Sequence, residues 1–140
     1  MPQVREALSD AEVSRTFRVM RQLRPHLDEE AYAGQVRRMR GEGYRLAAVL
    51  EGEEVVCVAG FRIAEFLAHG RFLYVDDLVT DEGARSTGGG RLMLGWLADE
   101  ARRNGCEKLQ LDSGVRRHAA HRFYFREGMR ITSYHFSKTL

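Results

Sequence analysis

The run Arg85-Ser86-Thr87-Gly88-Gly89-Gly90 has the residue types and spacing that point most directly to chemistry. It follows residues 72–80, which the residue pattern predicts as a strand, and precedes a predicted helix that begins at Arg91. The first N–H groups of a helix have no partner within the helix, and the helix dipole favours negative charge there. Glycines let the backbone turn tightly and approach a ligand closely. We therefore predict that main-chain N–H groups hold a phosphate-bearing ligand at this turn.

Two common nucleotide-binding patterns fail on this run, each at a residue with a defined physical role. A Walker A loop matches the separation of Gly83 and Gly88, but Gly89 and Gly90 stand where its lysine and hydroxyl residue are required. The Rossmann fingerprint matches Gly88 and Gly90, but Met93 stands where the third glycine or alanine is required. The ligand is therefore not assigned by either pattern.

The pattern Arg85-x-x-Gly88-x-Gly90 resembles the pyrophosphate loop of the GNAT superfamily of N-acetyltransferases. One predicted helix and one predicted strand further on, residues 120–129 resemble the A-x-x-F-Y-x-x-x-G-F signature of the family, and residues 74–80 resemble the strand before the loop. There are two departures from the family pattern: Arg117 stands where asparagine is frequent, and Met129 replaces phenylalanine.

The resemblance implies acetyl-CoA as the co-substrate and no metal ion. The pyrophosphate would lie on the N–H groups of the loop, and the pantetheine would pair with the preceding strand as an additional strand does. The residues implied to bind the cofactor are Leu78, Val79, Thr80, Arg85, Ser86, Thr87, Gly88, Gly89, Gly90 and Arg91.

Tyr124 has the sharpest role in the resemblance, which implies that its phenol protonates the leaving CoA thiolate. A positioned general acid contributes roughly 10²–10⁴ in rate. The alternative is that Tyr124 is a core aromatic residue between Phe123 and Phe125. Direct attack of the amine needs no cysteine as a covalent carrier.

Asp76 and Asp77 are the carboxylates of the strand before the loop. Because side chains alternate along a strand, we predict that the two lie on opposite faces and do not share a role. Asp76 is a candidate base or substrate anchor, since polyamine-acetylating relatives carry an acid at the matching position, and Asp77 is the weaker candidate. The alternative for either residue is a hydrogen-bonded structural acid.

The elements that must position these residues combine two helices, a meander of strands and a strand–helix–strand–helix–strand series, which together predict a mixed α+β sheet. The resemblance implies a three-layer α/β/α fold, whose mostly antiparallel central sheet is flanked by about four helices. The predicted strands are residues 2–7, 44–50, 55–64, 71–80, 108–112 and 129–138. The predicted helices are residues 10–23, 28–41, 91–104 and 118–127.

The bulk properties predict one domain over residues 1–140. Cys57 and Cys106 are expected to be reduced thiols. Residues 1–8 lack the apolar segment of a signal peptide, and no apolar run has the length of a bilayer span, so a cytoplasmic location is expected. A net charge of +2 does not favour nucleic acid as a partner.

The sequence therefore predicts an N-acetyltransferase that moves an acetyl group from acetyl-CoA to a primary amine in a ternary complex. The alternative is a catalytically silent CoA-binding module with a regulatory or partner-binding role. The acceptor is left open between small-molecule and peptide amines, with a preference for cationic amines because of Asp76 and Asp77. A homodimer formed through an edge strand near Tyr134 is a further option.

Overall fold

The computed structural model describes residues 1–85 and 87–140. Ser86, predicted to contribute to the phosphate loop, lies outside the described residues. The chain forms two compact units, Met1–Gln110 and Leu111–Leu140, which are described separately.

In the described residues the sheet has five strands, which lie side by side in the order of the chain. They are β1 (Gln3–Glu6), β2 (Arg45–Glu51), β3 (Glu54–Phe66), β4 (Gly70–Thr80) and β5 (Lys108–Leu111). The three pairs from β1 to β4 are antiparallel. The connection from β4 to β5 is a crossover that contains a helix, which is the connection found between parallel neighbouring strands. The sheet is therefore mixed. The predicted α+β fold with a mixed sheet is confirmed.

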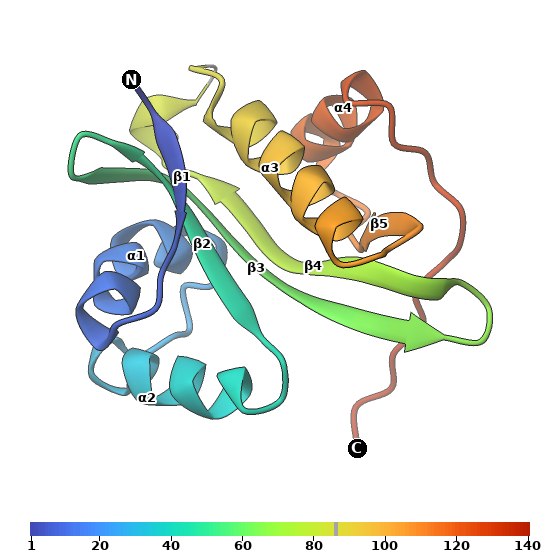
Figure 1. The fold of residues 1–140 in the computed structure, drawn as a ribbon, viewed down its shortest axis with the longest axis horizontal. Helices are drawn as coiled ribbons and strands as arrows, with labels where there is room; N and C mark the ends of the chain where they lie inside the picture. The colour runs from blue at the N-terminus through green and yellow to red at the C-terminus, as the bar shows by residue number, and fades with distance from the viewer. Residues whose placement is uncertain (86) are drawn as a thin grey trace. The chain divides into compact units, whose positions relative to one another are not determined.

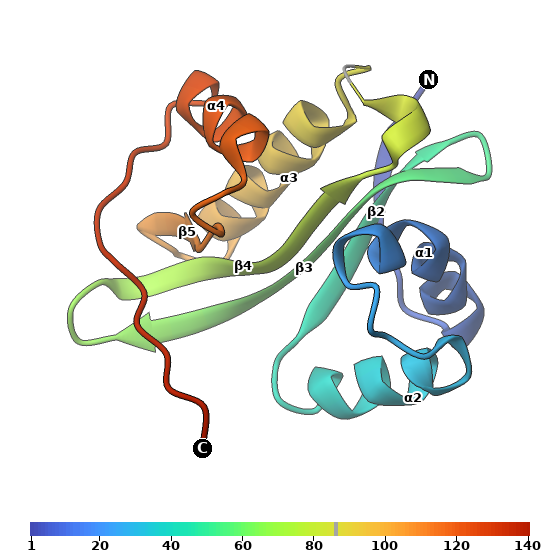
Figure 2. The same ribbon diagram turned by 180° about the vertical axis from the view of Figure 1, so that it is seen from behind.

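Helices cover both faces of the sheet in the unit Met1–Gln110. They are α1 (Asp10–Leu23), α2 (Glu29–Arg40) and α3 (Gly89–Arg103). Figures 1 and 2 show α1 and α2 on one face and α3 on the other. A capping box opens α1: Ser9 Oγ accepts the N–H of Glu12 at 3.1 Å, and Glu12 Oε1 accepts the N–H of Ser9 at 3.0 Å.

The core beneath α1 and α2 follows the helical period of the sequence. Val13, Phe17 and Met20 of α1 are buried, and Leu23 is partly buried against the same cluster. They pack with buried residues of the sheet such as Val58. This packing holds α1 and α2 against the strands that carry the candidate site.

Met93 and Leu97 of α3 are fully buried, and the ring of Trp96 meets Phe61 of β3 edge-on, with the ring centroids 5.8 Å apart. Leu92 does not share this buried face, because it is 39% exposed. Met93 lies one residue further round the helix and takes the inward position instead.

The unit Leu111–Leu140 contains α4 (His118–Arg126), which matches the predicted helix to within one residue. The predicted final strand at residues 129–138 is wrong: no strand is present after α4 in this unit. Ile131, Tyr134 and Phe136 are all more than two-thirds exposed. Alternation of side chains favours an extended segment, but a strand also needs a neighbour for its N–H and C=O groups.

None of the helices in the described part of the chain combines the length and apolar character needed to cross a membrane.

Because Cys57 of β3 is buried, we expect the folded protein to lose stability in mild base. The thiol is fully buried, and burial raises its pKa to about 11, opposed by the Thr80 hydroxyl that donates to Sγ at 3.7 Å. The thiol of the unfolded chain ionises near pH 9, whereas the buried thiol stays protonated until about pH 11. The contribution of Cys57 to the stability of the folded state is therefore complete below pH 9 and is lost as the pH rises towards 11. We expect the free energy of unfolding to fall by about 1.4 kcal/mol through Cys57 between pH 8 and pH 10.

Urea unfolding at pH 8, 9 and 10 measures this fall, with Cys57→Ala as the matched variant. The variant retains the losses from buried tyrosines, such as Tyr32, whose pKa is raised to about 12 chiefly by burial, and from Cys106, whose pKa burial also raises. An equal fall in both proteins would contradict the assignment to Cys57.

Candidate functional site

The base of the predicted phosphate loop is fixed by helix α1. After β4, residues Glu82–Ala84 form one 3₁₀ turn. The Asp81 carboxylate accepts hydrogen bonds from Gln22 at 2.7 Å and from Arg18 at 3.0 Å. The Gln22 amide lowers the pKa of Asp81 most strongly, and Arg18 adds to this effect against a smaller opposing effect of burial. The Glu82 N–H donates to Gln22 Oε1 at 2.9 Å, so the loop leaves the sheet along a defined path.

Gly88 is the N-cap of α3 and has φ 92° and ψ 3°, a left-handed conformation that glycine adopts without a Cβ penalty. The first bond within the helix runs from the Leu92 N–H to Gly88 O at 2.9 Å. The N–H groups of Gly89 and Gly90 therefore have no acceptor within the helix, and the helix dipole adds positive potential beside them. The predicted turn into a helix N-terminus is therefore present, and its binding of an anion stays a prediction.

The helix begins at Gly89 and not at Arg91, so the predicted boundary is wrong by two residues. Glycines have low helix propensity, which favours a turn at these positions. Gly89 nevertheless packs closely on the sheet, where a Cβ would lie 3.5 Å from the Cβ of Cys57. Tertiary packing thus extends the helix to the glycines.

Two other residues of the loop differ in what they can offer a ligand. The Thr87 hydroxyl and N–H both donate to Ala84 O, so this threonine shapes the loop. Arg85 is exposed and is the last described residue before Ser86.

The strand leading into the loop has one edge open within the unit Met1–Gln110. Residues 78–80 of β4 pair with residues 57–59 of β3 along one edge. On the other side, β5 begins beside Arg71, where the Glu107 N–H donates to Arg71 O at 2.9 Å. Leu78 lies seven residues beyond Arg71 along β4, which is about 23 Å at a rise of about 3.3 Å per residue. Because β5 spans four residues, it is too short to reach Leu78. The backbone of residues 78–80 can therefore accept an extended ligand along this edge.

The prediction that Asp76 and Asp77 lie on opposite faces is wrong, because β4 contains a β-bulge. Gly60 pairs with Asp77 and Phe61 pairs with Val75, which leaves Asp76 as an extra residue. An extra residue breaks the alternation of side chains and turns two consecutive residues towards the same side.

Both carboxylates accordingly lie on the Tyr44 side of the sheet. The Tyr44 hydroxyl donates to Asp77 Oδ2 at 2.8 Å, and Arg24 Nε donates to Asp77 Oδ1 at 3.0 Å. Arg62 holds Asp76 through Nη2 at 2.7 Å and Nε at 3.1 Å, and its guanidinium lies 5.6 Å from the Tyr44 ring centroid. Arg24 Nη2 also donates to the main-chain oxygen of Asp76 at 3.0 Å.

Tyr44 is 3% exposed and stays protonated, because burial first and then the charge of Asp77 raise the pKa of its phenol. A Cβ at Gly60 would overlap the Tyr44 hydroxyl and press on the Asp77 carboxylate. Glycine at position 60 is therefore a steric requirement of this hydrogen bond.

Sequence reasoning missed Arg24, Tyr44 and Arg62 as neighbours of the two aspartates. They come from the residue after α1, the residue before β2 and the middle of β3. No local pattern marks them, since their proximity depends on the packing of α1 and the pairing of three strands.

Tyr124 belongs to the other unit, on α4. It is 9% exposed, whereas Phe125 is 51% exposed, and its ring centroid lies 5.5 Å from that of Phe123. The Met129 N–H donates to Tyr124 O at 3.0 Å just beyond the helix. Nearby in this unit, His121 Nε2 lies 2.8 Å from the main-chain oxygen of Gly114.

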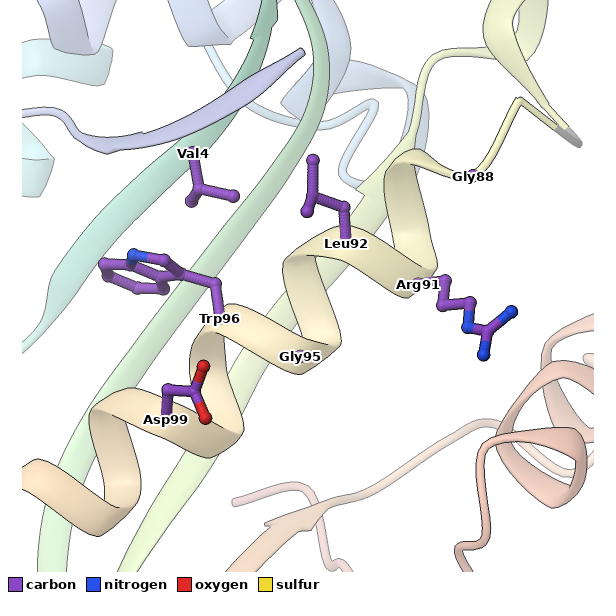
Figure 3. A pocket seen from close by; sticks show the side chains of 7 residues that line it. All are labelled: Val4, Gly88, Arg91, Leu92, Gly95, Trp96 and Asp99. Carbon is purple, nitrogen blue, oxygen red and sulfur yellow. The ribbon is translucent and has the colours of Figure 1, made fainter. Parts of the chain in front are cut away.

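An open pocket lined by α3 and by Val4 of β1 was not predicted. Figure 3 shows Val4 of β1, Leu92 and Trp96 gathered on one side of the helix, whereas the Arg91 guanidinium points away from them. The pocket reaches Gly88 at the N-terminus of the helix. Its wall is mainly apolar, so it adds surface beside the loop and little that could do acid–base chemistry.

The glycine-capped helix after a strand with an open edge, on a mixed sheet covered by helices, is the arrangement that the resemblance in the sequence implies. The chain belongs to the Acetyltransferase (GNAT) family, whose sequence profile matches residues 3–129. The matched segment spans both compact units. The resemblance found in the sequence and the predicted enzyme class are thereby confirmed.

Individual relatives agree with this assignment. The chain is 33% identical to the uncharacterized N-acetyltransferase YhdJ of Bacillus subtilis (strain 168), over 99% of both chains. It is 35% identical to the aminoalkylphosphonate N-acetyltransferase of Salmonella typhimurium, over 69% of this chain and 62% of that protein. The fold matches that of AAC(6')-Iy in complex with a bisubstrate analog of CoA, with a TM-score of 0.84, 11% identity, and 100% and 98% of the two chains covered.

Proposed function

We propose that this protein transfers the acetyl group of acetyl-CoA directly to a primary amine. The observation that carries the proposal is the junction of β4 and α3, where the open edge of residues 78–80 leads into the left-handed Gly88 cap and the N–H groups of α3. Two cofactor parts fit these two features: the amides of pantetheine match a strand edge, and the pyrophosphate matches a helix N-terminus. Relatives named as N-acetyltransferases support the same reaction.

The cofactor residues keep the roles implied by the sequence. Leu78, Val79 and Thr80 would pair with pantetheine through their backbone, and Gly88, Gly89 and Gly90 would hold the pyrophosphate through N–H groups. Arg85 and Arg91 would add positive charge beside these amides. Thr87 would act through the shape of the loop, since its hydroxyl is bound to Ala84 O.

The chemical step forms a C–N bond from the neutral amine and breaks the C–S bond of the thioester. Alignment of the two bound substrates supplies the largest share, on the order of 7–11 kcal/mol at best. Tyr124 gives its phenolic proton to the leaving thiolate. The proton lost by the amine goes to water or to Asp76, whose oxygens accept from Arg62. Asp77 positions its neighbours, because it is bound by both Tyr44 and Arg24 and is the less exposed of the two carboxylates.

Melting curves with CoA and acetyl-CoA, followed by CoA release over a panel of amines, test the proposal. Occupancy at about 100 times Kd stabilises the folded state by about 2.7 kcal/mol, so we expect the melting temperature to rise by several degrees. Absence of a shift at millimolar cofactor would contradict cofactor binding. A shift without CoA release from any amine would favour the silent CoA-binding module.

A further inference from the structure

Four charged side chains surround the β-bulge of β4 and balance one another. Arg24 is bound to Asp77 at 3.0 Å and Arg62 to Asp76 at 2.7 Å, so each carboxylate already has a guanidinium partner. Glu42 acts on Arg62 only through a weaker electrostatic effect than Asp76 does. An acceptor that meets this cluster therefore finds both signs of charge and no surplus of carboxylate.

The arginines are the more accessible members of the cluster. Their side chains are 41% exposed for Arg24 and 30% for Arg62, against 13% for Asp77 and 21% for Asp76. Each guanidinium has five N–H donors, and the bonds described above use Nε and Nη2. Among the described residues, the Nη1 groups of both arginines have no acceptor, so they can donate to a ligand.

Both guanidiniums are also held in place before any ligand binds. Arg62 is fixed by the paired oxygens of Asp76 and lies over the Tyr44 ring, and Arg24 is fixed by Asp77 and the main-chain oxygen of Asp76. An oriented guanidinium loses little side-chain freedom on binding, and its planar donors match the oxygens of an acid group.

We infer that the acceptor is a primary amine that also carries an acid group, a carboxylate or a phosphonate. The Nη1 groups of Arg24 and Arg62 take the acid group, and Asp76 faces the amine. This inference rests on the proposed function, which brings the thioester to the end of residues 78–80 nearest the bulge. It replaces the preference for cationic amines, which counted the two aspartates without their arginine partners.

Four acceptors of similar length test the inference: β-alanine, 2-aminoethylphosphonate, n-propylamine and 1,3-diaminopropane. A charge-assisted hydrogen bond from a fixed guanidinium corresponds to roughly a 10- to 100-fold preference. We expect kcat/KM for the two acid-bearing amines to exceed the values for the other two by that factor. A higher kcat/KM for diaminopropane would overturn the inference and leave the proposed acetyl transfer intact.

Arg62→Gln and Arg24→Gln locate the preference within the cluster. Each should reduce the ratio of kcat/KM for β-alanine to that for diaminopropane about tenfold, and the cofactor-induced shift in melting temperature should persist. Arg21→Gln, at an exposed position of α1, is the matched control and should leave the ratio unchanged. An unchanged ratio in both cluster variants would overturn the role of the arginines. If either variant fails to fold, the comparison of the four amines with the native chain still decides the inference.

Discussion

Replacement of Tyr124 by phenylalanine should lower kcat by roughly 100-fold or more, while the affinity for acetyl-CoA changes little. The substitution keeps the buried ring and its contact with Phe123, and it removes only the oxygen that would donate a proton to the thiolate. The loss should therefore appear in turnover and not in cofactor binding. Steady-state rates and the cofactor-induced melting shift, measured on the same protein, separate the two effects.

Tyr134→Phe is the matched control, since Tyr134 is 84% exposed in the segment after α4. Removal of its hydroxyl should leave both kcat and the melting shift unchanged. A native kcat in Tyr124→Phe would show that Tyr124 is a packing residue and that the thiolate takes its proton from elsewhere.

Gly88→Ala should remove about half of the cofactor-induced melting shift or more. The alanine Cβ would meet nothing within 4 Å, so the effect does not come from a clash. It comes from the left-handed φ of 92°, which costs a non-glycine residue roughly 1–2 kcal/mol and favours a different path for the loop. A displaced loop no longer aims the first N–H groups of α3 at one point, and we expect affinity for acetyl-CoA to fall about tenfold or more.

Gly89→Ala is the control one residue further on. Its Cβ would point towards Cys57 at an ordinary contact distance of 3.5 Å, and position 89 already lies in the helix. The shift should survive in this variant. Gly88→Asn provides a second comparison, because asparagine tolerates the left-handed region better than alanine. Equal shifts in Gly88→Ala and the native protein would place the phosphate site elsewhere.

Features that depend on neighbours in the chain were predictable from the sequence. The helix over residues 10–23, which Ser9 and Glu12 open, and the strand before the glycine run both appear where local patterns place them. Each is decided by residues within one or two turns, whose hydrogen bonds and backbone preferences act over that same short range. The resemblance of the loop and of residues 120–129 to one family added the enzyme class.

Features that depend on pairing between distant segments were not predictable in this way. The alternating residues 129–138 have the pattern of a strand but form none, because alternation does not supply a partner strand. The start of α3 at Gly89 follows from close packing on β3, which local propensity does not contain.

The sequence by itself determined the family of this protein and the loop proposed to hold its cofactor, since both depend on short motifs whose residues act together locally. Only the tertiary structure decided the surroundings of Asp76 and Asp77. The bulge of β4 turns both carboxylates to one face, and Arg24 and Arg62 reach them from different elements. Register and helix packing are non-local, so the charge balance that we propose selects the acceptor could emerge only from the folded chain.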